Sequence, residues 1–222
     1  MTTALELYET ALTTDSRLDY LCSGVSRPAG LERWVSARAP GDGGLLDRCV
    51  GHILDVGCGP GRLVAALTGR GAAALGVDVS AAAVRLTRSR GARAVRADVF
   101  GRLPREGLWD TVLLADGNIG IGGDPGRLLA RCVALLAPGG ALLVELDRPR
   151  RPTTVTELRL RVDAQVSAPF PWAFVSFTDL PRIAEVAHLD VAETWTRAGR
   201  WFAALTTPAP VTAAVTIGGE GR

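Results

Sequence analysis

The segment Ile53–Arg62, ILDVGCGPGR, holds residues whose types and spacing could bind a ligand. An apolar run leads into alternating glycines at Gly57, Gly59 and Gly61, where the absence of Cβ atoms lets the backbone turn sharply and a ligand lie against it. A helix that starts directly after them offers free N–H groups to an anionic part of that ligand. Asp78, at the end of the next expected strand, is placed to accept both hydroxyls of a ribose.

The spacing of the glycines separates two kinds of nucleotide site. A dinucleotide-binding fold needs G-x-G-x-x-G, in which the third glycine allows close packing of the helix on the strand. Here the glycines fall as G-x-G-x-G, and Arg62 stands where that third glycine is expected. The pattern therefore counts against NAD.

The same segment resembles the first motif of the class I S-adenosylmethionine-dependent methyltransferases, and further features agree in the right order. Asp78 matches the ribose-binding acidic residue of that family, and Asp98 matches the acidic residue that pairs with the adenine amino group. The run Leu136–Gly140 precedes the fifth expected strand as in the family, and Arg200–Leu205 resembles its last, antiparallel strand. The resemblance covers residues 45–207 and says nothing of the methyl acceptor.

This resemblance implies S-adenosyl-L-methionine as the cofactor and a metal-independent, in-line displacement at its methyl group. Because a sulfonium is already an activated leaving group, the protein mainly has to hold donor and acceptor in a near-attack geometry and exclude water. Asp116 would hold the methionyl ammonium, and Val99 with Phe100 would surround the adenine. The predicted cofactor-binding residues are Asp55, Gly57, Cys58, Gly59, Gly61, Asp78, Val79, Asp98, Val99 and Asp116.

Candidates for contact with the acceptor follow the fourth and fifth strands, because ligands of open α/β sheets bind outside the carboxyl ends of the strands. Asn118 lies in the glycine-rich loop Asp116–Asp124 and could reach the methionyl portion or the acceptor. Glu145 and Asp147 are two residues apart and share a face, so one of them could orient an amine or a hydroxyl. Asn118 and Asp147 are the predicted catalytic residues.

Neither histidine is well placed for general-base catalysis. His52 precedes the first strand at the opposite edge of the sheet, and His188 follows a helix that runs away from the ligand edge. A histidine base is therefore not supported. Arg148, Arg150 and Arg151 could bind a carboxylate or phosphate, although a solvated, proline-restricted loop is the favoured interpretation.

Aromatic residues mark the segments where a lid would be built. Phe170, Trp172 and Phe174 alternate with a period of two and could face a pocket or the core, and core packing is slightly favoured. Tyr8 and Tyr20 belong to the N-terminal cover and are further candidates for contact with a ligand.

All these residues need a scaffold that brings the ends of several strands together. From residue 53, short apolar runs alternate with helical patterns, and continuous apolar runs indicate strands buried on both faces. The sequence predicts an α/β fold, a doubly wound and mostly parallel sheet of about seven strands with the last strand antiparallel, helices on both faces and an N-terminal helical cover. The expected strands are Ile53–Val56, Ala74–Asp78, Ala94–Ala97, Thr111–Ala115, Ala141–Leu146, Asp190–Thr194 and Trp201–Leu205.

We expect a single methyltransferase domain over residues 1–222. Its parts are a helical cover at 1–50, a cofactor-binding core at 51–147, an inserted substrate-side segment at 148–177, sheet completion at 178–207 and a flexible tail at 208–222. Expected helices of the cover lie around Leu5–Leu12 and Leu31–Ala37, and Val155–Val166 in the insertion is strand-like.

Composition excludes several function classes. All 25 basic side chains are arginine, which excludes pyridoxal-phosphate enzymes, imine-forming aldolases and Walker-type nucleotide sites, because each needs a lysine. A formal charge of +2 gives no electrostatic case for nucleic acid. The cysteines form no CxxC pair, so no metal site is expected, and unpaired cysteines suit a reducing compartment.

The start, MTTALELYET, lacks the features of a signal peptide, and no apolar run is long enough to span a membrane. We therefore expect a cytoplasmic protein that binds a small-molecule acceptor, with neither nucleic acid nor membrane as partner and with its oligomeric state open. Two alternatives remain. The same cofactor could serve cyclisation or decarboxylation, or the fold could be a non-catalytic scaffold.

Overall fold

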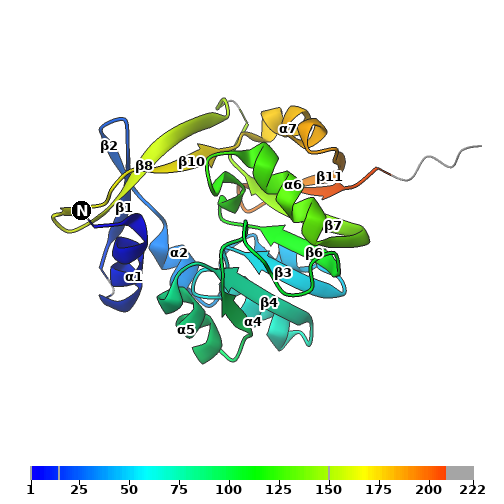
Figure 1. Ribbon diagram of the computed structural model, residues 1–222, viewed down its shortest axis with the longest axis horizontal. Coiled ribbons are helices and arrows are strands. Elements are labelled where there is room, and N and C mark those ends of the chain that lie inside the picture. The colour runs from blue at the N-terminus through cyan, green and yellow to red at the C-terminus, as the bar shows by residue number, and fades with distance from the viewer. Residues whose placement is uncertain (1, 15, 150, 209–222) are drawn as a thin grey trace, which may run out of the picture.

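A central seven-stranded sheet organises the chain in the computed structural model, which describes residues 2–14, 16–149 and 151–208 (Figure 1). The strand order is β11-β12-β7-β6-β3-β4-β5, and β12 runs antiparallel to both of its neighbours. The fold prediction is thus confirmed. The strands are β3 (His52–Val56), β4 (Ala73–Asp78), β5 (Ala94–Arg96), β6 (Trp109–Leu114), β7 (Leu136–Leu146), β11 (Asp190–Arg197) and β12 (Arg200–Thr206).

Helices cover both faces of this sheet because its strands are apolar on both faces. Leu54 of β3 and Leu113 of β6 have no exposed surface and point into opposite clusters of buried side chains. Helices α3 (Asp42–Leu46), α4 (Arg62–Gly69) and α5 (Ala81–Ser89) cover one face, and α6 (Pro125–Leu135) and α7 (Leu180–Val186) cover the other.

Local capping begins the helices where the sequence predicts it. The Ser80 hydroxyl accepts from the backbone N–H of Ala83 at the start of α5, and Asp124 accepts from that of Arg127 in α6. Each cap satisfies a backbone donor that the first helical turn leaves unpaired. After β5 the chain crosses back to place β6 beside β3, so the strand order reverses between β3 and β6. Such a switch point leaves a crevice outside the carboxyl ends of the strands.

A second, five-stranded sheet covers that crevice, and here the sequence prediction was incomplete. Residues 1–50 are not a purely helical cover, because a β-hairpin lies between α1 (Ala4–Thr14) and α2 (Leu31–Val35). This hairpin pairs with strands of the inserted segment in the order β10-β8-β1-β2, with β9 also on β8. The strands are β1 (Leu18–Cys22), β2 (Val25–Pro28), β8 (Thr154–Val162), β9 (Gln165–Val166) and β10 (Phe170–Phe174).

Two short 3-10 helices complete the described chain, η1 (Asn118–Gly120) after β6 and η2 (Phe177–Asp179) before α7. Strand β10 packs against η1, which ties the second sheet to the core. No helix among the described residues is long and apolar enough to cross a membrane. Arg150 and residues 209–222, which include nearly all of the expected tail, lie outside the described residues.

Candidate functional site

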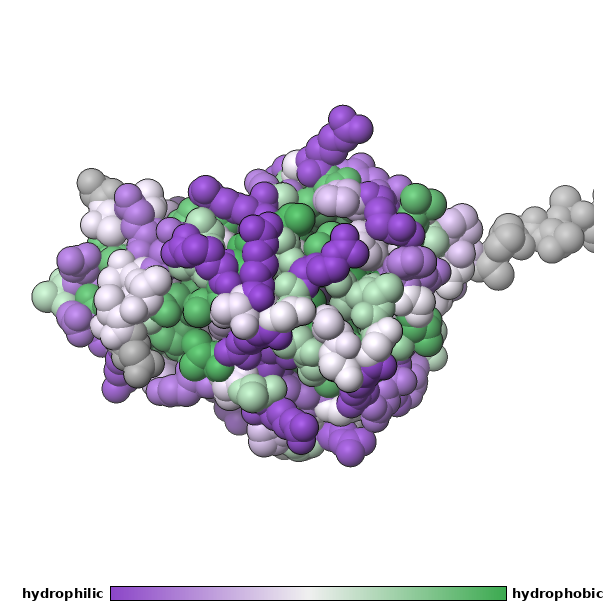
Figure 2. All heavy atoms as spheres, turned by 90° about the horizontal axis from the view of Figure 1, so that it is seen from below, coloured by the Kyte–Doolittle hydropathy of each residue, from purple (hydrophilic) through white to green (hydrophobic). Residues whose placement is uncertain are grey.

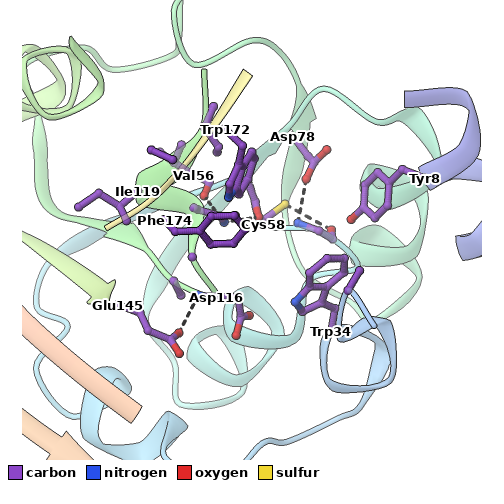
Figure 3. Close-up of a pocket in the computed structure, with 18 of the residues that line it drawn as sticks. Tyr8, Trp34, Val56, Cys58, Asp78, Asp116, Ile119, Glu145, Trp172 and Phe174 are labelled. Atoms are coloured by element: carbon purple, nitrogen blue, oxygen red, sulfur yellow. Dashed lines mark hydrogen bonds between the residues drawn. The ribbon is translucent and has the colours of Figure 1, made fainter. Parts of the chain in front are cut away.

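A cavity of about 720 Å³ lies between the carboxyl ends of the central strands and the second sheet (Figure 3). Seen from below, apolar side chains are exposed between the N-terminal elements on the left and the centre of the molecule, beside hydrophilic ones (Figure 2). Of the predicted site residues, those that line the cavity are Asp55, Gly57, Cys58, Gly59, Asp78, Val79, Asp98, Val99, Asp116, Asn118 and Asp147.

The glycine turn after β3 forms one wall of this cavity. Gly57 and Gly59 have φ values of 69° and 54°, which favour glycine. A Cβ on Gly57 would lie 2.7 Å from Nδ2 of Asn118, and one on Gly59 would lie 3.2 Å from the Tyr8 hydroxyl. The turn can therefore lie this close to Asn118 and Tyr8 only because these positions carry no side chain.

Gly61 is placed differently from the other two glycines. It is the N-cap of α4 with φ 84°, and a Cβ there would lie 2.5 Å from the Thr87 hydroxyl. Its missing side chain allows α5 to pack against the turn. Gly61 is not among the residues that line the cavity, so its predicted contact with the ligand is not supported by this geometry.

Asp78, the last residue of β4, holds the glycine turn through a backbone hydrogen bond. Its Oδ2 accepts from the backbone N–H of Gly59 at 2.9 Å, and its Oδ1 accepts from that of Ser80 at 2.8 Å. Burial raises the pKa of this carboxyl, while the two backbone hydrogen bonds act in the opposite direction. Each oxygen keeps further acceptor capacity, since a carboxylate offers about four lone-pair sites. The following residue, Val79, is 47% exposed and lines the same wall.

Asp98 follows β5, the strand that pairs with β4, and lines the cavity as well. It is exposed, and its Oδ1 accepts from the backbone N–H of Phe100 at 2.9 Å. Val99 is buried and lines the cavity, whereas Phe100 does not. The Phe100 ring instead lies 4.3 Å from the guanidinium carbon of Arg127, so the expected contact of Phe100 with adenine has no support in the structure.

Asn118 is held by the first strand of the core. Its Nδ2 donates to the backbone oxygens of Val56 at 2.9 Å and Gly57 at 2.8 Å. Both amide hydrogens are therefore used in fixing the glycine turn. This arrangement favours a positioning role over the predicted contact with the acceptor.

A buried network of ion pairs underlies the cavity, and sequence reasoning missed it. The Arg200 guanidinium donates to Glu145 at 2.8 and 2.7 Å and to Asp42 at 2.8 Å. Arg62, only 3% exposed, pairs with Asp42 and Asp116. The one signal in the sequence was Arg200 itself, a charged residue leading an otherwise apolar strand.

Arg33 of α2 joins this network from the N-terminal cover and also lines the cavity. Its Nη2 lies 3.0 Å from Oδ1 of Asp116. Asp116 has φ 54°, a conformation uncommon outside glycine, and its backbone N–H donates to Oε2 of Glu145 at 2.6 Å (Figure 3). With arginines already on its carboxylate, Asp116 is poorly suited to the predicted role of ammonium ligand.

The pKa values of Asp55 and Glu145 are shifted in opposite directions. Burial, with the charge of Asp116 acting in the same direction, raises the pKa of Asp55 to about 8. Burial also opposes ionisation of Glu145, but the hydrogen bonds and charge of Arg200 outweigh it and lower its pKa. Near neutral pH, Asp55 is therefore largely protonated while Glu145 is ionised.

Aromatic side chains enclose the cavity from two sides (Figure 3). Tyr8 and Trp34 come from the N-terminal cover, with ring centroids 6.2 Å apart, and Trp172 and Phe174 come from β10. The preference for core packing of Phe170, Trp172 and Phe174 was wrong, because all three are half-buried and line the cavity. Of the two alternate positions of β10, Ala173 is buried and Pro171 is exposed.

The remaining candidate residues fall into two groups, those that line the cavity and those that do not. Neither His52, whose Nδ1 lies 3.2 Å from Asp110, nor His188 at the end of α7 is among the cavity-lining residues of the described chain. Arg148 and Arg151 are exposed and line the cavity, together with Tyr20 of β1. No group of three or more metal-ligating side chains occurs among the described residues.

Comparison with known proteins was made on both sequence and fold. Residues 53–140 match the family described as "Methyltransferase domain". The chain is 34% identical over 125 residues to trans-aconitate 2-methyltransferase of Paracidovorax citrulli, a match that covers 54% of this chain and 46% of that protein. It is 32% identical over 113 residues to the enzyme of the same name from Delftia acidovorans, covering 49% and 42%. The chain thus spans less than half the length of these relatives.

Among solved structures, a methyltransferase from Bacteroides fragilis in complex with S-adenosyl-L-homocysteine superposes with a TM-score of 0.77 at 20% identity. The superposition covers 93% of this chain and 94% of that one, which establishes the fold. The family match falls on the strands and turns that carry Asp55, the glycine turn and Asp78. Residues 53–140 thus match a methyltransferase domain, and the chain as a whole has the fold of the Bacteroides fragilis methyltransferase.

Proposed function

We propose that this chain transfers a methyl group from S-adenosyl-L-methionine to a small-molecule acceptor by in-line displacement. One observation carries the proposal: the glycine turn hydrogen-bonds to the Asp78 carboxylate. This contact lies at the switch point of the sheet and on the wall of a large cavity. The match of residues 53–140 to a methyltransferase domain and the small-molecule substrate in the names of the curated relatives support it.

The residues present fit this cofactor. The turn at Gly57 and Gly59 lines the cavity, and a Cβ at either glycine would crowd the neighbouring Asn118 or Tyr8 side chain. Asp78 would accept from the ribose hydroxyls, and Asp98 with Val99 would border the adenine. Arg33 of α2 lines the same region, and although its Nη atoms face Asp116 and Glu145, its buried Nε has no hydrogen-bond partner among the described residues and would donate to the methionyl carboxylate.

When bound, the cofactor supplies a methyl group on a sulfonium that is already an activated leaving group. What remains for the protein is to hold the acceptor in line and keep water out. Tyr8 and Trp34 on one side and Trp172 and Phe174 on the other enclose the cavity for this purpose (Figure 3). Asn118 acts through the glycine turn, whose backbone it fixes.

Calorimetry with S-adenosyl-L-methionine, S-adenosyl-L-homocysteine and NAD tests the cofactor. We expect both sulfur ligands to bind, NAD not to bind, and Asp78→Asn to weaken both by about ten- to a hundredfold, as the loss of hydrogen bonds to a charged group implies. Asp163→Asn, an exposed carboxylate outside the cavity, is the matched control. Binding of NAD alone, or turnover without S-adenosyl-L-homocysteine as product, would contradict the proposal.

A further inference from the structure

The half of the cavity away from the glycine turn is built by the second sheet and the end of β7. Its walls are aromatic, with Tyr20 of β1 facing Phe174 of β10 at a centroid separation of 5.7 Å, and with Trp172 beside Phe174 on the same strand. Faces of aromatic rings attract cations as well as apolar groups. This half is where an acceptor would lie if the cofactor occupies the glycine turn.

Asp147 is the carboxylate of this half. Its backbone is fixed, because its N–H donates to the Val175 oxygen at 2.9 Å and its own oxygen accepts from the Phe177 N–H at 3.0 Å. Its side chain lines the cavity, and among the described residues it has no hydrogen bond and no ion pair. Burial raises its pKa, an effect that the charge of Arg151 partly offsets.

The arginines deeper in the cavity already pair with carboxylates of the protein. Arg62 and Arg200 are 3% and 8% exposed and lie between Asp42, Asp116 and Glu145. Arg33 faces Asp116 and Glu145 as well. A carboxylate acceptor would therefore find the buried arginines already paired, and the negative charge of Asp147 would repel it.

We infer that the acceptor is an amine, held as its ammonium form by the Asp147 carboxylate between the rings of Tyr20, Trp172 and Phe174. This inference rests on the proposed function. Asp147 takes a proton from the ammonium, the freed nitrogen lone pair forms the new N–CH₃ bond, and the S–CH₃ bond breaks with its electron pair left on sulfur. The product nitrogen carries the positive charge of the former sulfonium as a methylammonium, and Asp147 releases to water the proton that it took.

This assignment differs from what the sequence relatives suggest. Both are named for trans-aconitate, an acceptor that reacts through a carboxylate. The only arginines that line the acceptor half, Arg148 and Arg151, are exposed at its rim. Their charges act on Asp147, but both side chains are exposed, so they would bind an anionic group of the acceptor at the rim, away from the reacting nitrogen.

The test compares how tightly the site binds ligands that carry an amine, a hydroxyl or a carboxylate. It is made on the full chain saturated with S-adenosyl-L-homocysteine, so that no turnover occurs. Phenethylamine, 2-phenylethanol, 3-phenylpropionate and trans-aconitate are titrated by calorimetry. We expect the amine to bind at least about tenfold more tightly than the alcohol or either carboxylate. Asp147→Asn should bring the ratio of amine to alcohol affinity close to one, while Asp163→Asn, on the exposed β8–β9 turn, should leave the ratio unchanged.

Turnover with S-adenosyl-L-methionine and phenethylamine should give N-methylphenethylamine, identified by mass spectrometry. Tighter binding of the alcohol or of a carboxylate, no detectable binding of the amine, or a ratio that survives Asp147→Asn would overturn the inference. Failure of S-adenosyl-L-homocysteine to bind overturns the proposed function instead, and the same four titrations without it still test the amine site.

Discussion

The guanidinium of Arg200 donates hydrogen bonds to both carboxylate oxygens of Glu145, with Nε 2.8 Å from Oε1 and Nη2 2.7 Å from Oε2. The pair joins antiparallel β12 to β7, and both side chains are 8% exposed. Oε2 of Glu145 also accepts the backbone N–H of Asp116, which starts the left-handed turn after β6. A single ion pair between neighbouring strands thus fixes the edge of the cavity.

We expect Arg200→Met to lower the free energy of unfolding by about 3–5 kcal/mol, because it leaves buried carboxylates without their cation. Urea denaturation measures this change. Arg70→Ala is the control, since Arg70 pairs with Asp47 at the surface and both are about half exposed. That substitution should lower the free energy of unfolding by at most about 1 kcal/mol. Equal effects of the two changes would show that the buried network contributes little.

Asp55 should make stability depend on pH. Burial raises its pKa from 3.8 to about 8, so between these values the folded chain binds a proton that the unfolded chain has released. Its contribution to stability is therefore present below about pH 4 and is lost as the pH rises to about 8. Urea denaturation from about pH 5 to about pH 9 should show a smaller decline for Asp55→Asn than for the wild type. Parallel curves would contradict the assignment.

Asn118 should act through its two amide donors. Asn118→Ala removes the hydrogen bonds to Val56 and Gly57 and should cost about 1–3 kcal/mol of stability, with weaker cofactor binding. Asn118→Asp should be more damaging than Asn118→Ala, because it places a carboxylate oxygen against two carbonyl oxygens. Calorimetry and denaturation check both variants. If Asn118 instead contacts the acceptor, turnover will fall while cofactor affinity and stability stay unchanged.

Gly120 should be intolerant of any side chain. A Cβ there would lie 2.0 Å from the Ala173 oxygen and 2.7 Å from Nε1 of Trp172, so Gly120→Ala must push β10 away from η1. We expect fluorescence of the tryptophans to change and stability to fall. Gly126→Ala in α6 is the matched control, because its nearest contacts are at 3.6 Å. It should be neutral or stabilising by up to about 1 kcal/mol.

The core of the fold and the glycine wall of the site could be predicted because their signals are local. The apolar run before Gly57 indicates a buried strand, and the glycine spacing with Asp78 one strand later places a ligand. Ser80 and Asp124 begin helices through hydrogen bonds to residues only three positions away. Such features need no knowledge of distant segments.

The second sheet and the charge network could not be predicted because both depend on distant pairings. Leu18 of β1 pairs with Val162 of β8, and periodicity within either strand does not identify its partner. Arg33, Arg62 and Arg200 come from three parts of the chain and meet around the same carboxylates. For Trp172, alternation gave the two faces of the strand, but the choice between core and cavity was decided by which sheet the strand joins.

The pairing of β1 with β8 also bears on how acceptor preference could be changed. Tyr20 comes from one of these segments, and Trp172 and Phe174 come from a strand that pairs with the other. A chimera that exchanges only the insertion with a relative would combine mismatched strand edges and a mismatched aromatic pair. Transplanting selectivity between such enzymes therefore requires moving the hairpin and the insertion as one unit, while the nucleotide-binding half stays in place.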